Sequence, residues 1–164
     1  YCSKHAGLDE GQVVGFGGLL DSRRFTVALS SMGIKEEGMV LGEHGENQVP
    51  VFSRLSVDVP EAVREEVLLG LRGSSMPVIK GKGGTVFGPA YHIANMMQKI
   101  EKGEEFICSL PANGAYGIDG CSIGLPAKVT RNGAKINENL KLDDWETAKL
   151  NAAAEFLTGL CRRV

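Results

Sequence analysis

Asp21 and Arg24 have the residue types and the spacing to hold a small acid. They stand three residues apart near the start of a predicted helix, so both side chains lie on one face of it. A guanidinium near a helix N-terminus can bind a carboxylate through two parallel N–H···O hydrogen bonds. The spacing alone favours an ordinary surface ion pair, which contributes little stability. Arg23 points about 100° away around the helix and is expected to face solvent.

His44 is the candidate proton carrier. It stands in the segment GEHGE at the end of an apolar strand, where flanking glycines allow another group to come close. An imidazole with a pKa of about 6.5 can pass protons near neutral pH. A neighbouring carboxylate would hold its tautomer and stabilise its protonated form. The alternative is an exposed loop histidine. His5, in a terminal segment, and His92, in a helix where it is packed or solvated, are weaker candidates.

The glycines around these residues do not complete a nucleotide-binding motif. A dinucleotide fingerprint requires GxGxxG between a strand and a helix, and Gly15 and Gly17 are followed by Leu20 where the third glycine should stand. The segment GKGGTVF over residues 81–87 fails in the same way, and no GxxxxGK[ST] loop is present. We therefore interpret Gly15, Gly17 and Gly18 as a turn.

Short strands and long helices are predicted to position these side chains. The expected strands cover residues 12–16, 38–46, 49–57, 104–110 and 119–130, and the expected helices 20–33, 60–71, 86–102 and 143–161. Asn132-Gly133 is typical of a type I′ hairpin turn. Asp143 and Glu146 form an acidic capping box at the last helix. Because the strands follow one another through hairpins more often than through helices, we predict an α+β fold of antiparallel sheets with long packed helices.

The composition is that of an average globular protein. The 164 residues suit one domain, and a net charge of −2 gives no electrostatic reason to expect nucleic acid or a membrane surface as partner. No run of about 18 apolar residues is present to span a membrane. The four cysteines are scattered, which predicts reduced thiols in a cytoplasmic protein. Three histidines without an HxH or HExxH motif predict no metal site.

The ordered motifs resemble the lactate/malate dehydrogenase family. The segment VVGFGGLLDSRRF (13–25) carries that family's LDSxR helix start, and LGEHGENQVP (41–50) carries its GxHG strand end. The likeness continues through KGKGGTVFGPA (80–90), residues 112–136 and the closing helix, and so covers essentially the whole chain.

The resemblance implies a role for each matched position. Arg24 would bind the substrate's C1 carboxylate, and His44 would exchange the hydroxyl proton. Asp21 would orient His44 and favour its imidazolium form. Thr85 stands where the family places a small polar residue against the substrate, and Pro89 would approach the nicotinamide ring.

The resemblance also implies what lies outside this sequence. Members of the family are about twice as long, and their first half is a nucleotide-binding domain with the complete GxGxxG. Residues 1–164, which do not begin with methionine, are thus expected to be the C-terminal catalytic domain, with NAD or NADP bound mainly by the other half. The segments 80–90 and 124–134 favour malate and oxaloacetate as substrates over lactate and pyruvate. A homo-oligomer, dimer or tetramer, is implied.

Two functions of other classes remain possible from the sequence. The chain could be a non-catalytic binding or oligomerisation domain in which Asp21 and Arg24 are a structural ion pair. A histidine-based hydrolase would need a nucleophile, and Ser22 lacks the elbow motif around it. The dehydrogenase interpretation requires that the carboxylate of Asp21 lie within hydrogen-bond reach of His44. It also requires that Arg24 open into the same cleft.

Overall fold

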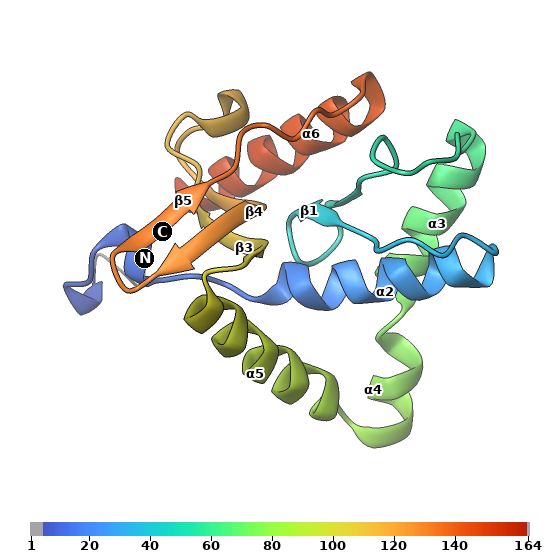
Figure 1. Ribbon diagram of the computed structural model, residues 1–164, viewed down its shortest axis with the longest axis horizontal. Helices are drawn as coiled ribbons and strands as arrows, with labels where there is room; N and C mark the ends of the chain where they lie inside the picture. The colour runs from blue at the N-terminus through green and yellow to red at the C-terminus, as the bar shows by residue number, and fades with distance from the viewer. Residues whose placement is uncertain (1–4, 164) are drawn as a thin grey trace.

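The computed structural model describes residues 5–163, which form an antiparallel sheet with helices on both faces (Figure 1). The strands are β1 (Val40–Gly42), β2 (Gln48–Pro50), β3 (Glu105–Pro111), β4 (Ser122–Thr130) and β5 (Gly133–Ile136). The helices are α2 (Gly17–Ser31), α3 (Glu61–Gly73), α4 (Met76–Lys82), α5 (Phe87–Lys102) and α6 (Asp144–Cys161), with 3-10 turns η1 (Glu10–Gln12) and η2 (Ala115–Gly117). The predicted α+β class is confirmed.

Strand β4 organises the sheet, whose order is β2-β1-β4-β3. One edge of β4 pairs with the whole length of β3. The other edge is shared, because β1 meets it where Gly42 lies opposite Gly124 and β5 pairs with its last four residues. A Cβ at Gly124 would lie 2.7 Å from the carbonyl oxygen of Gly42. The absence of a side chain there lets β1 approach the centre of the sheet.

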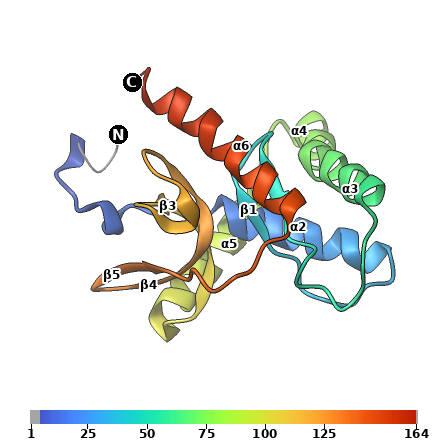
Figure 2. The same ribbon diagram turned by 90° about the horizontal axis from the view of Figure 1, so that it is seen from above.

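The helices divide between the two faces of the sheet. Seen from the side and from above, α6 crosses one face, while α2 and α5 lie on the other (Figure 1 and Figure 2). The larger core packs side chains of β3 and β4 against α6, including Ile123, Leu125 and Leu150. A second core joins α2, β1 and α3 through Phe25 and Phe52, whose rings meet edge to face at 4.9 Å. This second core holds α2 firmly in place.

Three predicted strands are wrong or too long. Residues 12–16 contain only an isolated bridge between Gly15 and Ser109, preceded by the turn η1. The strand predicted over 38–46 ends at Gly42, whose φ of +86° turns the chain out of the sheet. The strand predicted over 49–57 is limited to Gln48–Pro50, because the amides of Phe52 and Ser53 bond to a helix instead.

That helix contact is the carboxylate of Glu146, which is fully buried. Its Oε1 accepts from the amides of Phe52 and Ser53, both at 2.7 Å, and its Oε2 accepts from the Ser53 hydroxyl and the Asp143 amide. Asp143 in turn caps the Glu146 amide, which confirms the predicted capping box. One side chain therefore caps α6 and anchors the segment after β2.

The remaining elements agree with the prediction except in three places. Helix α4 and strand β5 have no counterpart among the predicted elements. The hairpin between β4 and β5 turns at Arg131 and Asn132 as expected, but only Gly133 has a positive φ, so the turn is not of type I′. Helix α3 ends at Gly73, two residues beyond the predicted end.

Neither α4 nor α5 carries a buried residue, unlike α2. Helix α5 is only partly covered: Met96 and Ile100 pack on the core, whereas Ile93 and Met97 are exposed. Within residues 5–163, no helix is long and apolar enough to cross a membrane.

Three of the cysteines lie in the described part of the chain, and each is a free thiol: Cys108 and Cys121 are buried and Cys161 is exposed. Burial raises the pKa of the Cys108 thiol to about 12. The prediction for Cys2 falls outside the described residues.

Replacing the buried carboxylate of Glu146 tests this arrangement. We expect Glu146→Ala to lower the free energy of unfolding by about 2–4 kcal/mol, because it leaves the amides of Phe52 and Ser53 without a hydrogen-bond acceptor. Urea denaturation followed by circular dichroism measures the loss. Glu155→Ala removes an exposed carboxylate from the same helix and should change stability by no more than about 0.5 kcal/mol. Equal losses in the two variants would contradict the proposed anchoring.

Candidate active site

Close packing, not a turn, accounts for two glycines before Asp21. Gly17 and Gly18 are the first residues of α2. A Cβ at Gly17 would lie 2.6 Å from the Cβ of His44, and one at Gly18 would overlap the side chain of Ile107. The prediction of a glycine turn is therefore wrong for these two positions. Their bare backbone lets the histidine and β3 lie directly against the start of the helix.

The structure brings Asp21, His44 and Arg24 together. Asp21 is buried, and its Oδ2 lies 2.6 Å from Nδ1 of His44. Its Oδ1 accepts a hydrogen bond of 3.0 Å from Nη1 of Arg24. One carboxylate thus holds an imidazole and a guanidinium at the same time, with each of its oxygens committed. The distance that the dehydrogenase reading requires between Asp21 and His44 is met.

A tight loop after β1 presents His44. The Glu43 carboxylate accepts from the backbone amide and the side-chain amide of Asn47, at 3.0 and 2.9 Å. The Glu43 amide also donates to the Asn47 carbonyl. These bonds close the loop around the histidine, so its backbone position is fixed from both sides.

Two hydroxyls of α2 hold the strand that carries this loop. Ser22 Oγ accepts from the amide of Val40 at 3.0 Å, and Thr26 Oγ1 accepts from the amide of Gly38 at 2.9 Å. Ser22 is therefore a structural side chain bound to β1, which argues against its use as a hydrolytic nucleophile. This structural role was not predicted, although Ser22 and Thr26 stand four residues apart and so share one face of the helix.

The surroundings of His44 favour its protonated form. The hydrogen bond to Asp21 raises the pKa of His44 above its ordinary value, against the opposing effects of partial burial and of the Arg24 charge. Half of the imidazole is exposed. With Nδ1 engaged by Asp21, Nε2 is the nitrogen that a ligand can reach.

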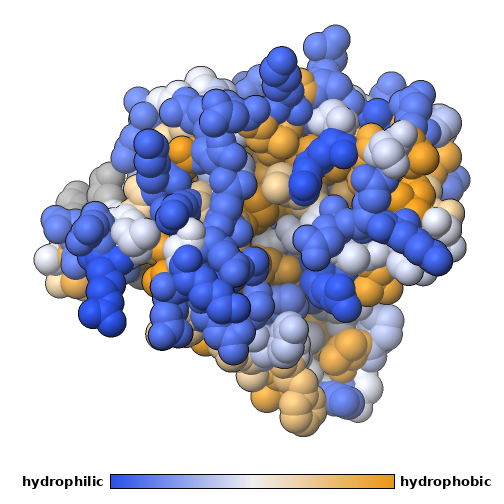
Figure 3. All heavy atoms as spheres, viewed as in Figure 1, coloured by the Kyte–Doolittle hydropathy of each residue, from blue (hydrophilic) through white to orange (hydrophobic). Residues whose placement is uncertain are grey.

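Arg24 also lines a cavity between α2, α4 and α5, with a volume of about 560 Å³. Thr85 and Pro89 line the same cavity, so three of the five predicted site residues meet there. His44 and Asp21 do not line this cavity, so it is not a cleft that Arg24 shares with His44. Apolar side chains such as Val86 and Phe87 are exposed around its rim, where Figure 3 shows apolar surface over α4 and the start of α5.

Three cavity residues were not assigned to the site from the sequence. Arg23 is exposed as predicted but also lines the cavity, and Lys82 lines it from the end of α4. His92 lines it from α5, and its Nδ1 is shielded without a hydrogen-bond partner in the described structure. The spacing could have predicted that Arg23 lines the cavity. It stands three residues after Leu20 on α2, so the two side chains share one face of the helix, and Leu20 also lines the cavity.

The cavity has an apolar wall. Its wall includes Leu20, Val78 and Pro89, against which a flat heterocyclic ring can pack. Among residues 5–163, no cluster of His, Cys, Asp and Glu side chains could hold a metal ion. An imidazole and a guanidinium thus share the Asp21 carboxylate, and the guanidinium residue also lines a cavity with an apolar wall. Groups of these kinds could serve in the reduction of a carbonyl beside a carboxylate.

The chain matches the family described as lactate/malate dehydrogenase, alpha/beta C-terminal domain, over residues 19–162. The malate dehydrogenase of Natronomonas pharaonis is 39% identical over 161 residues, which cover 92% of this chain and 53% of that protein. An L-lactate dehydrogenase of Macrococcus caseolyticus is 30% identical over 175 residues, 96% of this chain and 56% of that protein. The chain spans about half the length of the curated relatives it matches.

The fold agrees with a solved structure of the same kind. The malate dehydrogenase of Archaeoglobus fulgidus in complex with NADH superposes with a TM-score of 0.85 at 33% identity. The match covers 98% of this chain and 55% of that one. The antiparallel sheet and its helices are therefore those of a known architecture.

Removing the charge of Asp21 tests the electrostatics of the site. We expect Asp21→Asn to lower the pKa of His44 toward about 6.5, because the hydrogen bond to a carboxylate is what raises it. The raised pKa stabilises the fold below the unfolded-state pKa, and this contribution is lost as pH rises through the folded-state value. The variant should therefore lose more stability at pH 5.5 than at pH 8.5. NMR titration of the imidazole and urea denaturation at both pH values measure these effects.

Glu46→Gln is the matched control for this prediction. Glu46 lies in the same loop and is exposed, and it does not contribute to the pKa shift of His44. An equal fall of the His44 pKa in both variants would show that general negative charge, and not the bond to Asp21, sets the titration.

Proposed function

The chain belongs to the lactate/malate dehydrogenase family, and on that premise we propose that residues 1–164 are the catalytic, substrate-binding domain of an NAD(P)-dependent 2-hydroxy-acid dehydrogenase. The observation that carries this proposal is the carboxylate of Asp21, which holds both His44 and Arg24. A structural ion pair alone would explain the bond to Arg24. It would leave a half-exposed imidazole with a raised pKa unexplained.

His44 supplies and recovers the proton. When a 2-keto acid is reduced, negative charge develops on the carbonyl oxygen, and the protonated imidazole both stabilises that charge and neutralises it by transferring its Nε2 proton. In the reverse direction, Nε2 accepts the hydroxyl proton. Asp21 keeps Nδ1 protonated throughout and so fixes which nitrogen exchanges the proton.

Arg24 holds the carboxylate of the substrate. Its Nη1 is bound to Asp21, and the residue lines the cavity, where its other N–H groups could form a bidentate pair with a carboxylate. The contact with Asp21 restricts the rotation of the guanidinium, so the substrate carboxylate is oriented as well as attracted. Thr85, on the opposite wall, contributes a hydroxyl that can bond to a polar group of the substrate.

The cofactor is NAD or NADP, which would exchange a hydride with the substrate carbon. Pro89 and the apolar wall near it would pack against the nicotinamide ring. Nothing in the sequence completes a phosphate-binding glycine motif. We propose that a separate nucleotide-binding half holds the rest of the cofactor, as the half-length match to relatives suggests.

Malate and oxaloacetate are the proposed substrates, with lactate and pyruvate as the alternative. The 39% identity to an archaeal malate dehydrogenase exceeds the 30% identity to a lactate dehydrogenase, which supports this order. We also propose a cytoplasmic homo-oligomer, dimer or tetramer. Exposed apolar side chains such as Phe87 and Tyr91 on α5, and Leu69 on α3, support an additional contact surface.

Replacing Arg24 in the intact dehydrogenase tests the proposed substrate contact. We expect Arg24→Leu to lower kcat/KM for the 2-keto acid by at least about 100-fold, because it removes a bidentate charged contact while the fold is kept. Steady-state kinetics and circular dichroism measure the two effects. Arg131→Leu removes an exposed arginine at the β4–β5 hairpin and should leave the kinetics unchanged. Unchanged kcat/KM in Arg24→Leu would end the assignment.

Residues 1–164, studied without the proposed nucleotide-binding half, test whether the cofactor site is divided between two domains. Residues 1–164 alone should bind NAD weakly and show negligible turnover, since only the nicotinamide end has a surface to pack against. Calorimetric titration with NAD and an activity assay measure both properties. Micromolar affinity for NAD would contradict the need for a second half.

A further inference from the structure

The loop that carries His44 is not held by apolar packing. Strands β1 and β2 are three residues long each, and their pairing ends where Gly42 lies opposite Gln48. Residues 43–47 connect this last pair, and none of the five is buried. Segments with little buried surface sample several conformations unless polar contacts restrict them. The hydrogen bonds within the loop therefore decide where the imidazole lies.

Glu43 takes part in the hydrogen bonds that close this loop. Its carboxylate Oε2 accepts from the backbone amide of Asn47 at 3.0 Å and from the Asn47 side chain at 2.9 Å. Its own amide donates to the Asn47 carbonyl at 3.0 Å, and its carbonyl accepts from the Gly45 amide at 2.9 Å. These bonds run from the residue before His44 to residues after it, so they close the chain around the histidine.

Gly45 shows how closely the Glu43 carboxylate lies against the loop. A Cβ at Gly45 would overlap Oε1 of Glu43. The glycine is therefore needed for the space that it leaves to the carboxylate. The side chain of Glu43 thus reaches past His44 to the backbone of the following residue.

Glu43 does not bind the imidazole of His44 directly. Nδ1 of His44 is bonded to Asp21 at 2.6 Å. This hydrogen bond is also the main cause of the raised pKa of His44, and the negative charge of Glu43 makes a lesser contribution. The principal effect of Glu43 on His44 is therefore exerted through the conformation of the loop.

We propose that Glu43 is a positioning residue, which binds Asn47 across the loop and so holds the imidazole of His44 on the carboxylate of Asp21. Without these bonds the loop can open, and His44 can move away from Asp21. The consequence for the reaction rests on the proposed function, in which His44 exchanges the proton. A reacting group displaced by about 1 Å can slow a reaction about 100-fold.

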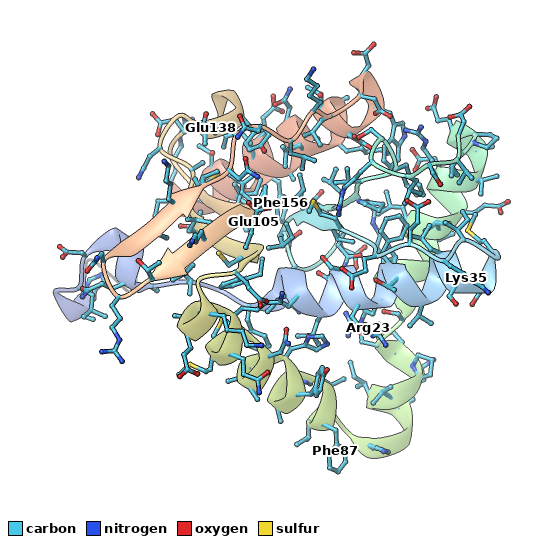
Figure 4. The ribbon with its side chains drawn as sticks, viewed as in Figure 1. Arg23, Lys35, Phe87, Glu105, Glu138 and Phe156 are labelled. Carbon is cyan, nitrogen blue, oxygen red and sulfur yellow. The ribbon has the colours of Figure 1, made fainter. Side chains whose placement is uncertain are left out.

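The cavity beside Arg24 lies apart from this loop. Neither Glu43 nor Asn47 lines it. Arg23, which does line it, lies on the side of α2 that faces α4, as Figure 4 shows, whereas the loop follows β1. Loss of the Glu43 carboxylate is therefore expected to impair proton transfer and to leave the binding of an acid at Arg24 nearly unchanged.

Deleting the carboxylate in the intact dehydrogenase tests the proposal. We expect Glu43→Ala to lower kcat for the 2-keto acid about 10- to 100-fold and to change KM by no more than about threefold, because the proton donor moves while the carboxylate contact is kept. Kinetics at about pH 6 keep most of the imidazole protonated, so the loss reports its position. The pKa of His44, followed by NMR, should fall toward about 6.5 as the bond to Asp21 weakens.

Two further variants separate hydrogen bonding from charge and from misfolding. Glu43→Gln keeps an oxygen that can accept from Asn47, and it should restore kcat to within about threefold of the wild-type value. Asn47→Ala removes one of the two bonds from the other end and should cause a smaller loss of the same kind. Circular dichroism checks the fold of each variant.

Glu46→Ala is the matched control, because it removes an exposed carboxylate from the same loop. It should change neither kcat nor the pKa of His44. An unchanged kcat or an unchanged His44 pKa in Glu43→Ala would overturn the positioning role, as would an increase confined to KM. A loss in Glu43→Gln or Glu46→Ala as large as that in Glu43→Ala would overturn it too. A wild-type enzyme that reduces no 2-keto acid would refute the proposed function instead, and the pKa of His44 would still test the role of Glu43.

Discussion

The carboxylate of Asp21 is shielded from solvent and divides its two oxygens between the imidazole of His44 and the guanidinium of Arg24. A buried carboxylate requires such partners, because an unpaired charge away from water is costly. This requirement couples the two groups that the proposed reaction needs in fixed relation. This one carboxylate favours the protonated form of His44 through one oxygen and orients Arg24 through the other.

His44 can reach Asp21 only because α2 begins with glycines, which have no side chain in the first turn. Gly17 leaves room for His44, and the hydroxyls of Ser22 and Thr26 hold the strand from which the histidine loop extends. The close contact of Gly42 with Gly124 brings that strand to the sheet. Residues with no chemical part in the proposed reaction therefore determine its geometry.

Much of this arrangement could be read from local sequence signals. The capping box of Asp143 and Glu146 is a short-range pattern, and it located the start of α6 correctly. The partnership of Asp21 with His44, which was implied by the family resemblance and not by local signals, is present as a 2.6 Å contact. The catalytic roles of these side chains remain predictions.

What the sequence did not reveal depends on contacts between distant segments. The strand after Gln48 is short because Glu146, far along the chain, takes the amides of Phe52 and Ser53. Helix α4 was missed because its seven residues include a proline and a glycine and lack a buried stripe. The glycines before Asp21 resemble a turn locally, and only the position of His44 in space shows why side chains are absent there.

The two walls of the cavity are supported to different degrees. The wall that bears Arg23 and Arg24 belongs to a helix anchored by the buried rings and aliphatic groups of Phe25 and Leu29, whereas α4 and α5 opposite it bury no residue. The wall formed by α2 is consequently the more firmly packed of the two. An acid bound at Arg24 would lie against this packed surface, while the helices opposite have no buried side chain to hold them in a single position.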